Sequence, residues 1–449
     1  MTAKAIRRIS LAATWIARIL TGGVFTLSGL TKGIDPWGTL YKFQDYVAAI
    51  GLDIWPELLL TGVFALCVLE FLTGVFILFG SFRRSAPVMA ALFMVVMLPL
   101  TLWIAIWNPV ADCGCFGDAI IISNWATFWK NVVLSIAVIW LLRHNRQARA
   151  LVNPYVQWIA AVVSSLFIIY VSAFGYLVQP MIDFRPYSTG TVLVDYEQNA
   201  DDTDDTDELA AMVFVYSKDG IEREFRSTDS LPDEDDGWQF VERRSIEPGN
   251  HDAITTAHSP ASPRIRIWSR DGEEDMSEDA VGDGQQLLLM VPQLSKVSAA
   301  TTWQINSLYE WCTRHDVEMF AVVSGNSEEI DRWQDISLAE YPIYTADDTA
   351  IKEVVRGNPG VVYLDNDTII WKSSLKALDT DDFLAADNTG TPRDFGYNYR
   401  DAFTRALILY VTVMLALVIL SYSPAAVRFF RARSGHNPTD ADGNQQNIK

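Results

Sequence analysis

The chain has 449 residues, half of them apolar, and a formal net charge of -20. Its length is too great for one ordinary domain, so we expect at least two. The acidic balance argues against nucleic acid as a partner, because phosphate backbones require a basic face. Four cysteines are too few for a disulfide-stapled fold.

Six apolar runs predict an α-helical membrane bundle of six transmembrane helices, with membrane lipid as its first partner. Each run is long enough to cross a hydrocarbon core of about 30 Å. A signal peptide is the alternative for the first run, but its length and the later spans favour a retained helix. The runs cover residues 9–30, 56–79, 87–107, 125–142, 155–178 and 403–422.

Four clusters of basic residues predict in which direction each span crosses the membrane. The clusters lie at alternate span ends and comprise Lys4, Arg7 and Arg8, then Arg83 and Arg84, then Arg143, Arg146 and Arg149, and finally Arg428, Arg431 and Arg433. Because basic loops favour the cytoplasm, both termini are predicted to be cytoplasmic. The connections 31–55 and 108–124 and the large segment 180–401 are then external. This predicts a protein of the bacterial inner membrane with residues 180–401 in the periplasm.

Two charged residues lie inside the first two spans. At about 1.5 Å per residue, Arg18 and Glu70 lie about 13 and 15 Å from the inner ends of their spans. Since such charges seldom face lipid, we expect a buried Arg18–Glu70 ion pair, either as structural support or as a substrate or quinone contact. Gly22, Gly23 and Gly29 offer a small-residue surface for close helix packing.

Cys113 and Cys115 lie one residue apart in the connection 108–124. Their spacing is not a zinc pattern, and no metal site is expected. Gly114 permits the backbone distortion that a CxC bridge needs. The small ring predicts a strained and relatively oxidising disulfide, which suits transfer of oxidation to another protein. The alternatives are two reduced cysteines without chemistry, or a static CxC staple.

Two acidic residues flank this pair. Asp112 and Asp118 would raise the thiol pKa values unless a basic group or a helix start compensates. Thiol reactivity depends on the thiolate, so this balance decides whether the pair can react.

The first third of the chain carries a specific pattern. It comprises Arg18, Phe25, Ser28, Gly29, Lys32, Asp35, Pro36, Glu70 and the loop Asp112, Cys113, Gly114, Cys115, Phe116, Gly117 and Asp118. Over residues 9–143 this pattern resembles the DoxX/MauE group of four-helix membrane proteins, and the CGCFG motif points to the MauE-like branch. The resemblance implies a four-helix bundle at 1–150. It also implies that Cys113 and Cys115 are a redox pair acting on exported or periplasmic proteins with thiols, with a quinone as candidate electron acceptor.

The next part of the chain is more polar. Residues 151–180 predict a fifth helix, and residues 181–262 a periplasmic linker with a small β insertion. Within it, strands are expected at 212–217 and 221–225, and a loop at 227–262. The segment 201–208 has six acids in eight residues. Calcium binding is conceivable there, but a solvated linker is favoured because the spacing of an EF-hand is missing.

Residues 263–390 alternate between strand and helix patterns. Strands are expected at 265–268, 287–291, 318–323, 341–344, 361–364 and 368–372, and helices at 299–315, 327–336 and 349–356. Over 263–385 this order resembles a thioredoxin-like domain, and the resemblance makes Pro359 the candidate cis-proline. The fold class predicted for the whole chain is therefore a helical membrane bundle plus a periplasmic α/β thioredoxin-like domain.

This domain departs from the thioredoxin pattern at the position of the two reactive cysteines. Residues 292–298 contain no cysteine where that family carries CxxC, so the domain cannot exchange dithiols by itself. Cys312 and Cys67 read as small buried hydrophobes. Residues 402–423 then form the sixth span, and residues 424–449 a cytoplasmic tail.

Two functions of different classes follow. The first is a membrane thiol–disulfide redox protein that uses the CxC pair. The alternative is a non-enzymatic membrane scaffold whose redox-inactive thioredoxin-like domain binds a partner protein. Transport is a weaker third hypothesis, supported only by the intramembrane polar residues Arg18, Lys32, Asp35 and Glu70.

Overall fold

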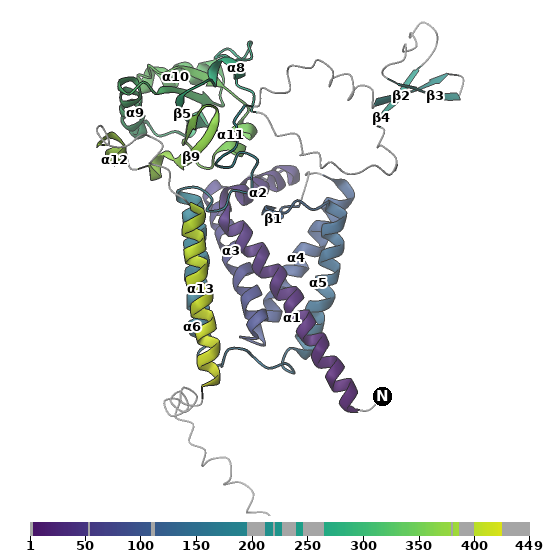
Figure 1. The fold of residues 1–449 in the computed structure, drawn as a ribbon. Coiled ribbons are helices and arrows are strands. Elements are labelled where there is room, and N and C mark those ends of the chain that lie inside the picture. Colours follow the sequence, from purple (N-terminus) through teal and green to yellow (C-terminus); the bar gives the residue numbers. More distant parts are fainter. Residues whose placement is uncertain are drawn as a thin grey trace, which may run out of the picture.

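The computed structural model describes residues 3–52, 54–108, 113–194, 265–378, 380–385 and 399–423, and the backbone of residues 212–218, 221–226 and 239–245. Six helices stand side by side, and a domain built on a mixed sheet lies across one end of them (Figure 1). They are α1 (Ala3–Ile34), α3 (Pro56–Phe79), α4 (Ser85–Trp107), α5 (Asn124–His144), α6 (Gln157–Leu177) and α13 (Tyr399–Tyr422).

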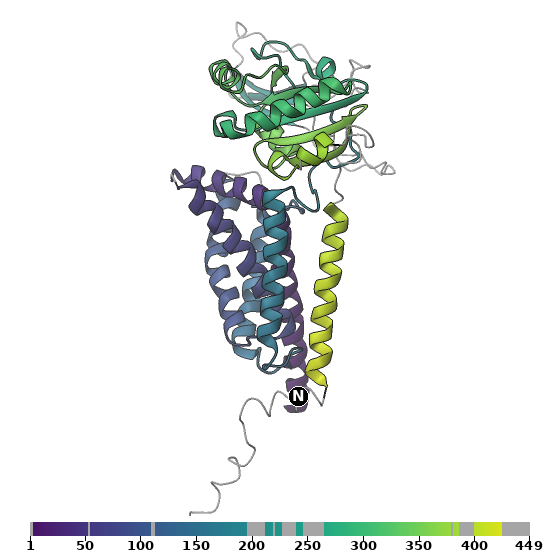
Figure 2. The same ribbon diagram turned by 90° about the vertical axis from the view of Figure 1, so that its left-hand side faces the viewer.

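All six helices are long and apolar enough to cross a membrane, which confirms the six predicted spans. The helix α13 stands at the edge of the bundle (Figure 2) and packs on α6, where the rings of Phe167 and Tyr410 stack at 4.4 Å. The first residues of α1 and the last residues of α13 lie at the end of the bundle away from the sheet domain (Figure 1).

Glycines bring α1 and α3 into close backbone contact. A methyl group added at Gly29 would come within 2.4 Å of the Phe71 backbone nitrogen, and one at Gly74 within 2.3 Å of the Thr26 nitrogen. Such small residues let helix backbones approach closely. Gly23, which we expected on the same surface, faces open space.

Replacing Gly29 with alanine should therefore force α1 and α3 apart. We expect a loss of about 1–3 kcal/mol in the free energy of unfolding, as for other overpacked sites. Thermal unfolding of the purified protein in detergent would measure it. Gly23→Ala is the matched control, because it adds the same methyl group to the same helix without a neighbour. Equal effects of the two substitutions would contradict the close contact.

Arg18 is fully buried, but its partner is not Glu70. Its guanidinium donates to the Asn145 side chain at 2.7 Å and to the carbonyl oxygens of Asn145 at 2.6 Å and Arg149 at 2.9 Å. It thus satisfies carbonyl groups after α5 that have no partner within the helix. The predicted Arg18–Glu70 ion pair is wrong.

A helix that the sequence analysis missed, α2 (Pro36–Ile50), lies in the connection 31–55 and covers one end of the bundle (Figure 1). Asp35 is its N-cap and accepts a hydrogen bond from the Gly38 nitrogen at 2.9 Å, and Pro36 occupies the first turn. Both are ordinary start signals of a helix. The search for spans does not find α2, because its 15 residues are too few to cross a membrane.

The sheet domain comprises the described residues between 265 and 385. Its strands are β5 (Gln285–Val291), β6 (Glu318–Val323), β7 (Ile343–Thr345), β8 (Gly360–Asp365) and β9 (Thr368–Ser374). Their order is β7-β6-β5-β8-β9, with parallel pairing among β5, β6 and β7 and antiparallel pairing of β8 with β5 and β9. The buried strands expected at 287–291 and 318–323 are confirmed, because their continuous apolar runs are covered on both faces.

Helices cover both faces of this sheet. They are α8 (Ser277–Ala280), α9 (Thr302–Arg314), α10 (Ser327–Ser337), α11 (Asp348–Val354) and α12 (Thr380–Ala385), with 3-10 turns at Leu294–Lys296, Ala299–Thr301 and Leu375–Ala377. The helices α9 and α10 pack on one face, and α11 on the other. The strand expected at 265–268 is only a pair of isolated bridges at Trp268.

A separate small sheet has the order β3-β2-β4, formed by β2 (Met212–Lys218), β3 (Ile221–Arg226) and β4 (Gln239–Ser245). The two strands expected around residue 219 are confirmed. β4 is a correction, because it lies within the predicted loop 227–262. Its mixture of polar and apolar residues gave little periodicity to recognise. The acidic segment 201–208 lies outside the described residues.

The segment after α6 attaches the bundle firmly to the sheet domain. The Ile369 nitrogen donates to the Thr191 oxygen at 2.9 Å, so residues 190–193 extend the sheet at the edge of β9. Beneath this edge the Asp183 carboxylate accepts from Arg185 at 2.7 Å and from Lys372 at 2.5 Å. These buried bonds fix the position of the domain relative to the membrane helices.

Candidate functional site

The two thiols lie close together in the short loop of residues 113–118, which contains β1 (Cys115–Asp118). The Sγ atoms of Cys113 and Cys115 are 3.2 Å apart, and both cysteines are free thiols. Gly114 has φ +58, and a side chain there would meet Lys42 Cδ at 2.4 Å. Glycine is therefore needed both for the turn and for the close approach of Lys42.

The pair is more enclosed than expected from the sequence. Cys113 is only 7% exposed and packs with Tyr46 and Ile104. Cys115 is half-buried. The Tyr46 hydroxyl, from α2, donates to the Cys113 carbonyl oxygen. The cover comes from α2, which was not anticipated, so the thiols are not openly presented at the surface.

The hydrogen bond between the two thiols shifts their pKa values in opposite directions. It lowers the pKa of Cys115 to about 6, because the Cys113 thiol donates to the Cys115 thiolate, and Lys130 and Lys32 support this against the effect of burial. The same contact and burial raise the pKa of Cys113. The lowered pKa of Cys115 and the raised pKa of Cys113 favour a pair of one thiolate and one thiol, which is the form that attacks a disulfide.

The structure describes one of the two acids that flank the thiol pair. Asp112 lies outside the described residues. Asp118 is engaged by cations, with Lys42 Nζ at 3.1 Å and Arg356 Nη2 at 2.8 Å. Burial alone would raise the pKa of Asp118, but Arg356 and Lys42 hold it below its usual value. Its charge is therefore neutralised by these partners. Phe116 and Gly117 complete the turn, and Lys130 lies 4.5 Å from the Phe116 ring centroid.

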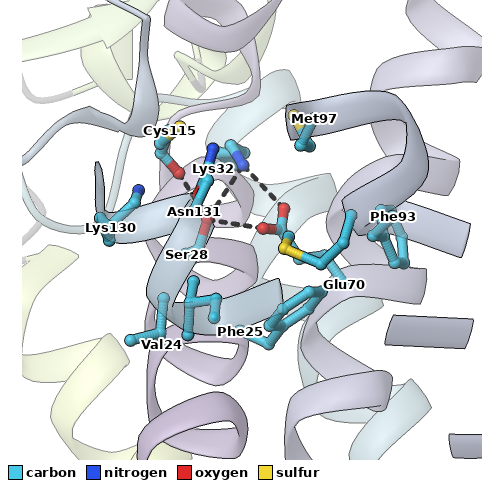
Figure 3. A pocket seen from close by; sticks show the side chains of 12 residues that line it. Val24, Phe25, Ser28, Lys32, Glu70, Phe93, Met97, Cys115, Lys130 and Asn131 are labelled. Carbon is cyan, nitrogen blue, oxygen red and sulfur yellow. Dashed lines mark hydrogen bonds and ion pairs between the residues drawn. The ribbon is translucent and has the colours of Figure 1, made fainter. Parts of the chain in front are cut away.

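A buried ion pair lines the same pocket as Cys115 (Figure 3). Lys32 Nζ is 2.7 Å from Glu70 Oε2, with side-chain exposures of 4% and 10%. Lys32 also donates to Ser28 Oγ at 3.0 Å, one helical turn earlier. Ser28 Oγ lies 2.7 Å from Glu70 Oε1 and 2.5 Å from the Cys115 carbonyl oxygen. A continuous hydrogen-bond chain thus connects the carboxylate to the thiol loop.

This chain borders a narrow pocket among α1, α3, α4 and α5, with room for about one water molecule. Half of its lining side chains are apolar, and Lys32 and Glu70 are buried, so their charges are weakly screened. Its lining comprises Val24, Phe25, Ser28, Lys32, Glu70, Phe93, Met94, Met97, Cys115, Lys130, Asn131 and Leu134.

A second cluster joins the thiol loop to the sheet domain. Arg356 follows α11 and is buried, and its guanidinium binds Asp35 at 2.7 Å as well as Asp118. Burial alone would lower the pKa of Arg356, but Asp35 and Asp118 raise it. Gln179 adds paired bonds to the Arg356 backbone at 2.7 and 3.1 Å. One arginine therefore connects α2, the thiol loop and the domain.

The remaining candidate residues lie away from the thiols in different settings. The Asn358–Pro359 peptide bond is cis, and Asn358 Nδ2 donates to the Gln293 oxygen at 2.7 Å. Cys67 and Cys312 are fully buried among apolar neighbours.

The sequence analysis missed four residues of the site: Arg356, Lys42, Tyr46 and Lys130. Only Lys130 had a usable signal, because it is a charge inside the predicted span 125–142. The others reach the loop through long-range contacts that no local pattern reports.

Comparison with known families supports the first part of this description. Residues 10–144 match the family model described as Methylamine utilisation protein MauE. The first four spans are therefore similar to MauE. Residues 210–247, which contain the small sheet, match Domain of unknown function (DUF8463). No curated protein and no solved structure matches the chain. The MauE-like part is consistent with a redox-related role in a membrane.

Proposed function

We propose that the protein is a membrane thiol–disulfide oxidoreductase whose reactive groups are Cys113 and Cys115. The observation that carries the proposal is the contact of the two Sγ atoms at 3.2 Å. This distance is short enough that formation of a disulfide needs only a small movement of the loop. The MauE-like match of the surrounding helices agrees with this chemistry.

The reaction balances with one partner disulfide. The Cys115 thiolate attacks a sulfur of the partner's disulfide, forms a mixed disulfide and releases one partner thiolate. Cys113 then loses its proton and attacks Cys115 Sγ, which releases the second partner thiolate and leaves a Cys113–Cys115 disulfide. Two electrons pass to the partner in this direction, and the reverse sequence oxidises an exported dithiol.

A quinone is our candidate acceptor for continued oxidation. A quinone would supply an acceptor for two electrons and two protons. The narrow pocket beside Cys115 has no room for a quinone ring, so the described lining does not fit this group. Addition of a water-soluble quinone analogue to the reduced protein tests this candidate.

The proposal also gives the sheet domain a role. The strand order, with β5 and β6 parallel and β8 and β9 antiparallel, agrees with a thioredoxin-like domain. Because residues 292–298 contain no cysteine, we assign this domain a binding role. It would hold an exported protein near the thiol loop to which Arg356 connects it. We place it in the periplasm of a bacterium, with both termini in the cytoplasm, on the charge pattern of the loops.

The burial of Cys113 favours the rival function, a scaffold in which the loop is structural. Replacing both Cys113 and Cys115 with serine in the native host separates the two. Under our proposal, exported proteins accumulate with reduced thiols, which an alkylating mass tag detects on gels. Under the rival, their thiol state is unchanged. The Cys67→Ser, Cys312→Ser protein is the matched control, since it removes the thiols on α3 and α9, outside the loop 113–118.

A further inference from the structure

We infer that Lys32 and Glu70 tune the thiol pair: Lys32 stabilises the Cys115 thiolate, and Glu70 competes with that thiolate for the same ammonium group. The inference rests on the proposed redox function and adds two positioning residues to it. These residues lie beside the loop, on α1 and α3, and among the described residues their hydrogen bonds go to each other and to Ser28 rather than to a sulfur atom.

Lys32 lies near two groups that can carry a negative charge, the Glu70 carboxylate and the Cys115 thiolate. Its ammonium has three N–H groups, and the described residues account for two acceptors, Glu70 Oε2 and Ser28 Oγ. Lys32 and Cys115 line the same pocket from one side (Figure 3). A thiolate at Cys115 is therefore a second negative charge near one buried cation.

The charge balance then depends on the oxidation state of the pair. With the disulfide formed, Cys115 carries no charge and Lys32 neutralises Glu70 alone. With the reduced pair, the thiolate and Glu70 together exceed the charge of Lys32, and Lys130 at the pocket edge supplies the balance. Because charges interact strongly where water is scarce, each change at Lys32 or Glu70 shifts the thiolate's stability.

Charged and titratable groups surround the thiol loop on several elements. Lys32 on α1, Glu70 on α3 and Lys130 on α5 line the pocket with Cys115, and the α4 residues in that lining are apolar. From α2, Lys42 lies against Gly114 and Tyr46 binds the Cys113 carbonyl oxygen. Lys42 is held by Asp118, and Tyr46 by the Cys113 carbonyl oxygen. Replacing the carboxylate partner of Lys32 therefore leaves the Lys42–Asp118 pair and the Tyr46–Cys113 hydrogen bond in place.

Two substitutions should act in opposite directions. Glu70→Gln releases Lys32 to the thiolate, so Cys115 should react faster with iodoacetamide below pH 5, where the thiolate is the minor form, by up to tenfold for a shift of one pKa unit. Lys32→Met leaves Glu70 to repel the thiolate, so the reaction should slow by a similar factor. Stabilising the reduced form makes a pair more oxidising, so a tenfold change corresponds to a rise of about 30 mV in Glu70→Gln and a fall in Lys32→Met.

The experiment uses the full chain in lipid nanodiscs, with Cys67 and Cys312 replaced by serine. Alkylation rates of the reduced protein from pH 4 to 10, and the potential from equilibration with glutathione, are compared among variants. Lys32→Arg keeps the charge and should preserve the pH profile. Ser164→Ala, a buried change on α6, should leave it unchanged.

Shifts of the pH profile in opposite directions support the inference. Shifts in the same direction, as a loosened bundle would give, or no shift in either variant, would overturn it. The alkylation profile reads the thiolate itself, whether or not the pair reacts with any partner. Failure of the proposed redox function therefore appears separately, as a pair that alkylates normally but never forms a disulfide with glutathione.

Discussion

Replacing Arg356 with methionine should detach the sheet domain from the thiol loop. The substitution leaves Asp35 and Asp118 without their shared guanidinium, and Asp35 is buried. Breaking a buried ion pair by removing one partner costs about 3–5 kcal/mol, because the remaining charge is uncompensated. We expect faster hydrogen exchange in residues 113–118 and in α2, measured by mass spectrometry on the protein in nanodiscs.

The matched control is Arg332→Met. Arg332 pairs with Glu328 on the same domain, but their side chains are 66% and 84% exposed, and such pairs contribute little. Hydrogen exchange of the thiol loop should therefore be unchanged in the control. If Arg356→Met also left the exchange of the loop unchanged, the proposed connection between domain and loop would be wrong.

Replacing Asp183 with asparagine should weaken the second attachment of the sheet domain to the membrane helices, which runs through the segment after α6. Arg185 and Lys372 both donate to this carboxylate, and their side chains are only 4% and 5% exposed. The amide leaves two buried cations without a counter-charge, so we expect a loss of about 3–5 kcal/mol. Limited proteolysis between α6 and the sheet domain would detect the loosened segment.

The same carboxylate predicts an acid transition. Burial alone would raise the pKa of Asp183, but Arg185 and Lys372 lower it to about 2. The unfolded value is about 3.9, so the contribution to stability is complete above that pH and disappears as the pH falls toward 2. Its size is roughly 2–3 kcal/mol. Unfolding followed by tryptophan fluorescence from pH 6 to 2 should show this loss in the unmodified protein.

Asp183→Asn should abolish that part of the pH dependence. Asp331→Asn is the control, because its pair with Arg270 is exposed, with side chains 64% and 45% accessible. The control should retain the acid transition at the same pH. An acid transition of full size in Asp183→Asn would show that other carboxylates produce it.

The sequence predicts the membrane helices well because each has a mainly apolar run of the required length. It failed at α2, where Asp35 and Pro36 mark a helix start but no apolar run follows. That omission has a direct consequence for the site. The sequence predicts that the thiols lie in an external connection, and in the structure α2 covers Cys113 there through Tyr46.

The partner of Glu70 was predicted wrongly for a geometric reason. Span ends read from hydropathy placed Arg18 and Glu70 at the same depth. In the structure Arg18 lies level with Gly80, just after the end of α3, because a methyl group at Gly80 would meet the Arg18 guanidinium at 2.7 Å. Ten residues of helix, about 15 Å, separate Gly80 from Glu70. Lys32, near the other end of α1, is therefore the residue that reaches Glu70.

In the sheet domain, too, local sequence patterns predict the strands but not the long-range contacts. Apolar runs and turn residues predict β5, β6, β8 and β9, because these features are local. Arg356 has no local feature that distinguishes it from an exposed arginine after a helix. Its role depends on Asp35, which is 321 residues away in the chain, and only the folded arrangement brings the two together.

The most direct test of the redox proposal is the oxidation state of Cys113 and Cys115 in living cells. Free thiols would be trapped with a mass-tagging alkylator before and after a short pulse of reductant, in protein lacking Cys67 and Cys312. We predict a mixed population at rest that becomes reduced during the pulse and reoxidises within minutes. A pair that stays in one state throughout would contradict the proposed thiol–disulfide function and would favour a structural loop in a membrane scaffold.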